Sequence, residues 1–231
     1  MIKLENCEVV GWEHAIRGMR NPMNSWGKSD TCTQGPVWCG EFCGNSECSC
    51  ETGLNIGPND HDLMMRLTNG GPVHAKYRRM IAVYVDITAP LYWWKEFDTY
   101  KVGTVSNSCS TMHKIHEKVF TLEDFSCEHL IDECMGDELF APLSYLKMTI
   151  NSLNGCRNAY LETKDKKYWW QMIQLLPSSY NQRRTIMLNY EVLVGIYRDR
   201  KTHKLDEWRD FCAWIEKLPF SEIITGGIRC E

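Results

Sequence analysis

The segment from Ile81 to Pro90 constrains the fold more than any other part of the chain. Ile81, Val83, Val85 and Ile87 alternate with other residues, which is the period of a strand with one buried face. Pro90 lacks a backbone donor and ends the strand. Because such a strand buries one face, it needs partner strands and covering helices, so the segment predicts a sheet at the centre of the fold.

Other segments predict an α+β protein around this strand. Residues 2–10 alternate weakly and predict a first strand. Asn59 is expected to cap one helix, and Thr121 with Asp124 forms a capping box for another. Helical spacing or caps predict helices at residues 13–19, 60–69, 121–134, 165–176, 185–200 and 205–219. With no repeat and no linker, we expect one domain over residues 1–231 with a cysteine-rich inserted loop at about 30–54.

Charge and hydropathy exclude several classes of protein. The chain has 231 residues and a net charge of -4, so no excess of positive charge favours nucleic acid or membrane surfaces. No apolar run reaches the ~18 residues of a membrane span. The first residues, MIKLENCEVV, lack the apolar core of a signal peptide. We therefore expect a cytoplasmic protein.

The chain has twelve cysteines, and five of them lie between residues 32 and 50. A chain of this length builds its own core, so a secreted disulfide framework is not expected. Four thiolates in a Gly-rich loop are suited to tetrahedral zinc, which would hold a segment without a core. The alternative is a reduced insertion that binds no metal. The candidate zinc ligands are Cys39, Cys43, Cys48 and Cys50.

After Ala89-Pro90 an aromatic segment is followed by a loop rich in hydroxyl groups, and this order resembles the flavin-dependent thymidylate synthases. In that family a strand ends in Ala-Pro, a Gln follows, and a signature loop RHRxxSxNxxSxR comes next. Aligned without gaps, the positions that meet the Gln and then the signature are Glu96, Thr99-Tyr100-Lys101, Thr104, Ser106, Cys109 and Thr111.

A second block resembles the same family. Residues 176–208 are similar to a Leu-Pro, a spacer, Asn-x-Arg and an apolar helix that ends near a further Arg. Asn189 matches the Asn, Glu191 replaces the Arg, and Arg200 meets the later Arg, or Arg198 after a slip in the alignment. The resemblance covers roughly residues 60–217, without the loop 120–142.

The resemblance implies a mixed sheet flanked by helices and a homotetramer with ligand pockets between subunits. It implies methylation of deoxyuridine monophosphate with a folate, FAD and reduced nicotinamide. The implied substrate-binding residues are Glu96, Lys101, Thr104, Ser106, Ser108, Ser110, Asn189, Arg198 and Arg200. The implied FAD-binding residues are Thr99, Tyr100 and Lys101.

The signature has lost positive charge in this chain. Thr99 and Thr111 stand where the family has Arg, Tyr100 replaces His, and Glu191 replaces a second-block Arg. Phosphate binding needs fixed positive donors, each worth about 1.5–3 kcal/mol. A catalytically inactive descendant that binds a nucleotide or a protein is therefore the alternative to an active enzyme.

Three further patterns have alternative interpretations. Cys109 with His113 and His116 is suited to a thiol nucleophile or a metal site if the fold brings them together. The pairs Trp93-Trp94 and Trp169-Trp170 are either base-stacking platforms or parts of the core. A zinc hydrolase built on the cysteine loop lacks the His-x-Glu partner that zinc deaminases carry.

Overall fold

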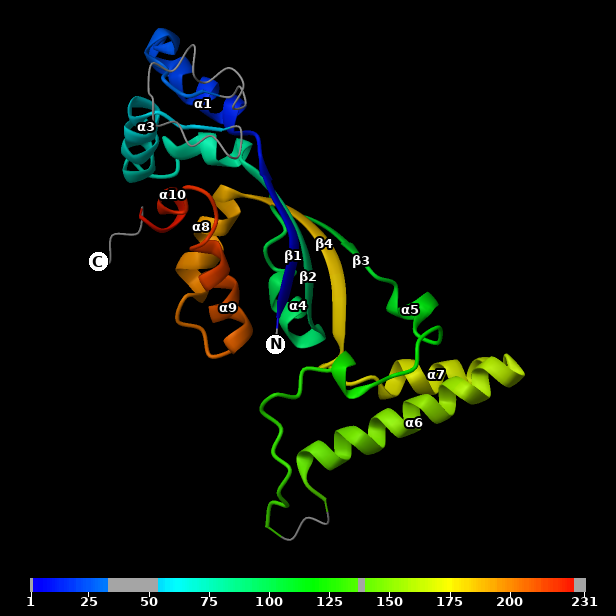
Figure 1. Ribbon diagram of the computed structural model, residues 1–231. Helices are drawn as coiled ribbons and strands as arrows, with labels where there is room; N and C mark the ends of the chain where they lie inside the picture. Colours follow the sequence, from blue (N-terminus) through cyan, green and yellow to red (C-terminus); the bar gives the residue numbers. More distant parts are fainter. Residues whose placement is uncertain (1, 33–53, 137–139, 227–231) are drawn as a thin grey trace. The chain divides into compact units, whose positions relative to one another are not determined.

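The structure is a computed structural model that describes residues 2–32, 54–136 and 140–226 (Figure 1). The strands are β1 Lys3–Val10, β2 Ala82–Pro90, β3 Val105–Ser108 and β4 Asn181–Asn189. The α-helices are α1 Trp12–Arg20, α3 Pro58–Asn69, α4 Leu91–Phe97, α5 Thr111–Lys114, α6 Pro142–Thr163, α7 Lys166–Leu175, α8 Tyr190–Arg200, α9 Asp206–Ile215 and α10 Glu222–Thr225. Short 3₁₀ helices span Asn21–Met23, Trp26–Lys28, Ala75–Met80 and Leu122–Asp124.

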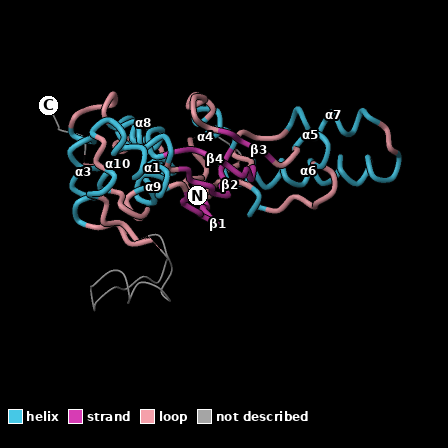
Figure 2. The backbone as a smooth tube through the Cα atoms, turned by 90° about the horizontal axis from the view of Figure 1, so that it is seen from above, coloured by secondary structure: helices cyan, strands magenta, loops and turns pink. Residues whose placement is uncertain are grey.

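The four strands form an antiparallel sheet in the order β1-β2-β4-β3, whose strands are magenta in Figure 2. The strand predicted at residues 80–87, with Pro90 closing it, is confirmed as β2, which runs on to Pro90. Its alternating residues Val83, Val85 and Ile87 are fully buried, as a one-sided strand requires. The α+β class predicted from the sequence is therefore confirmed.

The chain packs into two compact units. The first unit holds Met1–Asn6, Val85–Lys101 and Val105–Ile186, and the second holds Cys7–Tyr84, Val102–Thr104 and Met187–Glu231. The boundary falls within strands β1, β2 and β4, so both units are discontinuous in sequence. The single domain over residues 1–231 stays a prediction, and most of the cysteine-rich loop lies outside the described residues.

The first unit has a core between α6, α7 and the segment that precedes α6. Helices α6 and α7 lie side by side (Figure 1), and Lys164, in the left-handed region at φ 56°, makes the turn between them. The Asp165 side chain caps α7 by accepting a hydrogen bond from the Lys167 amide at 2.9 Å. The buried members of this core are Ile115, Phe120, Phe125, Leu146, Ile150, Leu153 and Met172.

The second unit is mainly helical. Its helices α1, α3, α8, α9 and α10 lie together in Figure 2. The helix predicted at residues 205–219 is confirmed as α9, with Trp208, Phe211 and Ile215 fully buried on one stripe. Two aromatic rings pack edge-on against Trp12 at the start of α1, those of Tyr190 and Phe220.

Three sequence predictions are wrong in detail. The Thr121 capping box opens only a three-residue 3₁₀ helix, because Phe125 turns into an extended bridge with Tyr180 and joins the core. Residues 185–189 belong to strand β4, so the helix predicted over 185–200 begins only at α8. Asn59 lies within α3, whose first amides are instead bound by the side chain of Asp30.

Candidate ligand-binding site

The polar loop that matches the family signature begins at the end of α4, in the first unit. Trp93, Trp94 and Phe97 are buried, so this helix is part of the core. The Thr99 hydroxyl donates a hydrogen bond to the carbonyl of Glu96 at 2.7 Å and extends the end of the helix. The resemblance implies that Thr99 binds FAD, but in the structure its hydroxyl group donates to a backbone carbonyl.

Residues 102–104 belong to the second unit, where they pack against the start of α8. Gly103 has φ +77°, and a Cβ on it would lie 2.9 Å from Nδ2 of Asn189. The Oδ1 atom of Asn189 accepts a hydrogen bond from the Val192 amide at 3.1 Å and caps α8. Among the described residues, the buried hydroxyl of Thr104 has no hydrogen-bond partner. Asn189, which was predicted to bind substrate, therefore has a structural function in this part of the chain.

The end of the loop is fastened to strand β4 in the first unit. The Cys109 amide donates to the Arg183 carbonyl at 2.9 Å, and the Gln182 amide group donates to the Cys109 carbonyl and the Thr111 hydroxyl at 3.0 and 3.2 Å. Ser110 caps the short helix α5 by accepting from the His113 amide at 3.1 Å. These bonds fix the backbone of residues 109–111. Three other predicted side chains are exposed in the same unit: Lys101, Ser106 and Ser108.

The predicted site residues of the second block lie in the second unit, and Glu191 has a partner there. Its carboxylate pairs with Arg78 at 2.8 Å, and the Arg78 side chain is only 4% exposed. Arg78 also donates to the carbonyl of Ile223 at 3.2 Å. A buried guanidinium requires an anionic partner, because an unpaired buried charge is strongly destabilising. Glu191, which stands where the family has Arg, therefore forms an ion pair with Arg78 within this unit.

The two arginines predicted to bind phosphate lie at the end of α8. The Nε atom of Arg198 pairs with Asp199 at 2.8 Å on the exposed surface. The Arg200 guanidinium lies 4.7 Å from the centre of the Trp208 ring, a cation–π contact. Both positions have local contacts in the second unit, and their use in ligand binding stays a prediction.

One pocket in the first unit, which we call the sheet-face pocket, has a volume of about 480 Å³. Its acidic and basic side chains are equal in number and form exposed pairs, such as Lys3–Glu5 at 2.9 Å. Arg183 is held by Asp86 at 2.8 Å. The polar lining comprises Lys3, Glu5, Thr88, Cys109, Ser110, Thr111, Lys114, Glu117, Lys118, Glu123, Asp124, Tyr180, Asn181, Gln182 and Arg183.

Asp86 accepts hydrogen bonds from three side chains of the sheet in this unit. Hydrogen bonds from Thr185, Asn6 and Arg183 hold the pKa of Asp86 far below its ordinary value. The same pair raises the pKa of Arg183. The carboxylate therefore stays ionised at neutral pH and holds the Arg183 guanidinium beside the pocket.

Another pocket in this unit, which we call the aromatic pocket, has a volume of about 300 Å³ and no carboxylate among its described lining residues. The Trp169 indole donates to the Met112 carbonyl at 2.9 Å, and Lys166 lies 5.8 Å from the centre of its ring. Lys164 lies 5.9 Å from the centre of the Tyr160 ring. The lining residues are Met112, His113, His116, Tyr160, Lys164, Lys166 and Trp169.

The aromatic pocket contains residues that the sequence analysis did not assign to a site. Tyr160, Lys164 and Lys166 come from the α6–α7 turn, far along the chain from the signature loop. The only available signal was the run of lysines before Trp169-Trp170. Cys109 lines the sheet-face pocket, whereas His113 and His116 line the aromatic pocket. This separation does not support a Cys-His catalytic pair.

No group of three or more His, Cys, Asp or Glu side chains suited to a metal ion lies within residues 2–32, 54–136 and 140–226. The candidate zinc ligands Cys39, Cys43, Cys48 and Cys50 fall outside the described residues. No helix in the described part of the chain is both long enough and apolar enough to cross a membrane.

Comparisons with known proteins find likeness in structure and not in sequence. No family model and no curated protein sequence matches the chain. A thymidylate synthase X (ThyX) from Helicobacter pylori, solved with FAD and dUMP, superposes with a TM-score of 0.61 at 14% identity, over 96% of each chain. A second structure of that enzyme with FAD and dUMP gives 0.60 at 14% identity, over 99% of each chain.

A UMP/dUMP methylase, PolB from Streptomyces cacaoi, was solved with 5-Br dUMP. It gives a TM-score of 0.60 at 13% identity, over 98% of this chain and 94% of that one. Because these similarities extend over nearly whole chains, they concern the complete fold and not one motif.

Proposed function

We propose that this chain, which has the fold of the flavin-dependent thymidylate synthases, binds a pyrimidine deoxynucleoside monophosphate along residues 109–116. The observation that carries the proposal is the aromatic pocket, where lysines and aromatic rings lie beside the end of the signature loop. Proteins of this fold have been solved with dUMP or 5-Br dUMP. The nucleotide is therefore the ligand class that both the fold and the pocket favour.

The chemistry of the aromatic pocket suits a phosphorylated base. Stacking of a base on an aromatic side chain contributes about 1–3 kcal/mol. Trp169 and Tyr160 supply such rings, and Lys164 and Lys166 supply positive charge next to them. Since no carboxylate is among the described lining residues, a phosphate group meets attraction without nearby repulsion.

The sheet-face pocket offers a second set of phosphate donors at the same loop. Its cations are paired on the surface, and exposed ion pairs are worth about 0–1 kcal/mol. A charged hydrogen bond is worth about 1.5–3 kcal/mol, so N–H donors of these cations that do not bind a carboxylate could each add to phosphate binding. Lys114 and the remaining N–H groups of Arg183, which keeps its bond to Asp86, are the donors that line this pocket with Ser110 and Thr111. In this proposal the first-unit loop residues Glu96 and Ser106 bind the base or sugar.

A second candidate function is methylation of that nucleotide with flavin, a folate and reduced nicotinamide. The observation in its favour is the near-complete similarity to structures that hold FAD and dUMP. Bound flavin would supply hydride chemistry. A homotetramer and a cytoplasmic location belong to the same proposal.

The residues at the expected flavin positions do not fit a diphosphate. Of Thr99, Tyr100 and Lys101, only Lys101 carries charge, and the Thr99 hydroxyl is bonded to a backbone carbonyl. Glu191 would repel phosphate, and it is already paired with Arg78. We therefore derive no catalytic step through flavin, and nucleotide binding without redox chemistry is the function that the geometry supports best.

Titration of the purified protein with dUMP tests the nucleotide proposal. We expect saturable binding that weakens about tenfold in Lys166→Ala, which corresponds to loss of one charged contact. Lys147→Ala is the matched control, since Lys147 is half exposed on α6 and outside both pockets. Deoxyuridine, which lacks the phosphate, should bind more weakly than dUMP. Equal binding of dUMP and deoxyuridine, or equal losses in the two lysine variants, contradicts the proposal.

Visible absorbance of the isolated protein and a titration with FAD test the second function. A colourless protein that takes up no flavin would contradict flavin-dependent methylation. This result would not contradict the nucleotide-binding proposal. Growth of a thymidine-requiring host on expression of the chain would instead establish methylation.

A further inference from the structure

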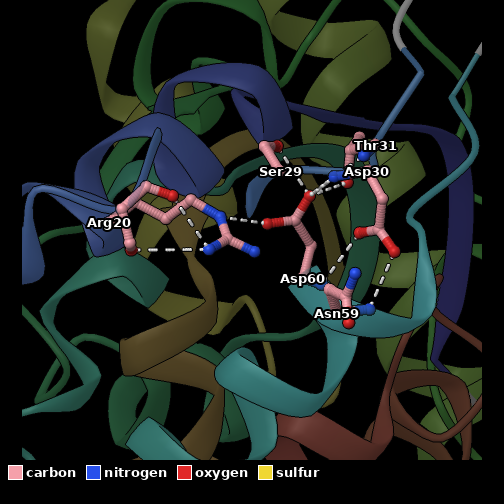
Figure 3. A network of polar contacts seen from close by, with 7 residues as sticks. Arg20, Ser29, Asp30, Thr31, Asn59 and Asp60 are labelled. Atoms are coloured by element: carbon pink, nitrogen blue, oxygen red, sulfur yellow. Dashed lines mark hydrogen bonds and ion pairs between the residues drawn. The ribbon is translucent and has the colours of Figure 1, made fainter. Parts of the chain in front are cut away.

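The second unit contains a buried ion pair between Arg20 of α1 and Asp60 of α3 (Figure 3). The Nε atom of Arg20 lies 2.6 Å from Oδ1 of Asp60, and the two side chains are 4% and 0% exposed. The other carboxylate oxygen of Asp60 accepts the hydroxyl groups of Ser29 and Thr31, both at 2.7 Å, and the amides of Asp30 and Thr31. Since this oxygen is fully used, Asp60 binds Arg20 through one oxygen only.

This arrangement leaves one end of the Arg20 guanidinium without an acceptor. Its Nη1 atom donates to the Ser25 carbonyl at 3.2 Å. Its Nη2 atom is buried and has no hydrogen-bond partner in the described part of the chain, and in Figure 3 no dashed line reaches it. A guanidinium has five N–H donors, and a buried donor that has no acceptor lowers the stability of the fold. An acceptor from outside these residues would remove that cost.

Arg20 lines a pocket of about 250 Å³, which we call the α1 pocket. Arg17 lies one turn earlier on the same helix face, so a second guanidinium borders the pocket. Trp26 is half exposed, and its indole N–H donates to Asn21, which leaves the ring face available for contact. The described lining residues are Glu13, Ile16, Arg17, Arg20, Trp26, Ser29 and Thr31.

We propose that the α1 pocket binds a small carboxylate-bearing molecule, with the carboxylate on Arg17 and on Nη2 of Arg20 and the apolar part against Trp26. Guanidinium groups bind carboxylates through paired N–H donors. Glu13 at the rim disfavours a doubly charged anion such as phosphate. Because Nη2 is covered, atoms next to it have to shift as the ligand enters. This site goes beyond the nucleotide proposal, whose pockets are built from residues of the first unit.

Calorimetric titration with sodium acetate at constant ionic strength tests this site, with inorganic phosphate and chloride as comparison anions. We expect saturable binding of acetate that is tighter than that of phosphate. Arg17→Gln should weaken it about tenfold, whereas Arg66→Gln should not, because Arg66 is an exposed arginine on α3 outside the pocket. Arg20→Lys should abolish binding.

Arg17→Gln keeps the test valid if Arg20→Lys fails to fold, since Arg17 takes no part in the Asp60 network. Three results would overturn the proposal. They are no saturation by acetate, binding of phosphate or chloride as tight as that of acetate, and equal affinity in Arg17→Gln and the wild-type protein.

Discussion

Replacing Asp60 by Asn tests how much the buried network stabilises the second unit. The two side chains have almost the same shape, so the substitution removes the charge and turns one acceptor oxygen into a donor. Five donors point at the Asp60 carboxylate, one from Arg20 at 2.6 Å and four from residues 29–31. Whichever oxygen becomes NH₂, it faces donors that it cannot satisfy.

The expected loss of unfolding free energy in Asp60→Asn follows from the burial of Arg20. Removing one partner of a buried ion pair costs about 3–5 kcal/mol, because the remaining charge is left without compensation. The matched control is Asp62→Asn on the same helix, whose carboxylate is 68% exposed and pairs with Arg66 at 2.9 Å. An exposed pair four residues apart on a helix contributes about 0.3–0.5 kcal/mol. The two variants should therefore differ by several kcal/mol.

Urea unfolding followed by tryptophan fluorescence measures this difference as a shift in midpoint. Burial alone would raise the pKa of Asp60, but hydrogen bonds from Thr31, Ser29 and Arg20 outweigh it and lower that pKa below its ordinary value of 3.8. A lowered folded-state pKa adds stability above about pH 3.8, which is lost as the pH falls through the folded value. The Asn variant cannot titrate, so its stability should change less below that pH. Equal midpoints for Asp60→Asn and Asp62→Asn at neutral pH would refute the reasoning.

Three further substitutions and one chemical reaction test other parts of the structure. Gly103→Ala should destabilise by about 1–2 kcal/mol, because φ is +77° there, whereas Gly155→Ala in the open middle of α6 should stabilise by about 0.5–1 kcal/mol; thermal melts of both variants check this. Glu191→Gln should cost about 1.5–3 kcal/mol, since Arg78 loses its charged acceptor, and a urea midpoint equal to that of the wild type would contradict the pair's importance. Burial raises the pKa of Cys212 to about 11, so at pH 8 iodoacetamide should leave this thiol unmodified in the folded protein; mass spectrometry of a digest reads the modification, and rapid labelling would argue against burial.

The elements with strong local patterns were predicted correctly from the sequence. β2 and α9 have regular apolar periods, so local spacing alone indicates which face they bury. The 22-residue helix α6 was missed because only Leu146, Ile150 and Leu153 are buried along its length, which leaves a weak period. The end of β4 was read as helix because its apolar residues continue directly into α8.

Several residues of the predicted site have local structural contacts, and their use in ligand binding stays a prediction. The sequence indicated a polar loop with reduced charge and a second block, and in the structure several of their residues bind the backbone. Ser110 and Asn189 are helix caps, and Thr99 binds a carbonyl. Capping and ligand binding require the same small polar side chains, so residue type alone does not separate these roles.

The sequence by itself determined the α+β class, the central strand and the order of aromatic helix and polar loop, because these depend on neighbours within a few residues. Only the tertiary structure decided the partners of charged and aromatic groups. Glu191 meets Arg78 across 113 residues, and the α6–α7 turn brings Lys166 and Trp169 beside Met112. Electrostatic and stacking energies depend on distances in space, and these distances are set by the packing of the whole chain.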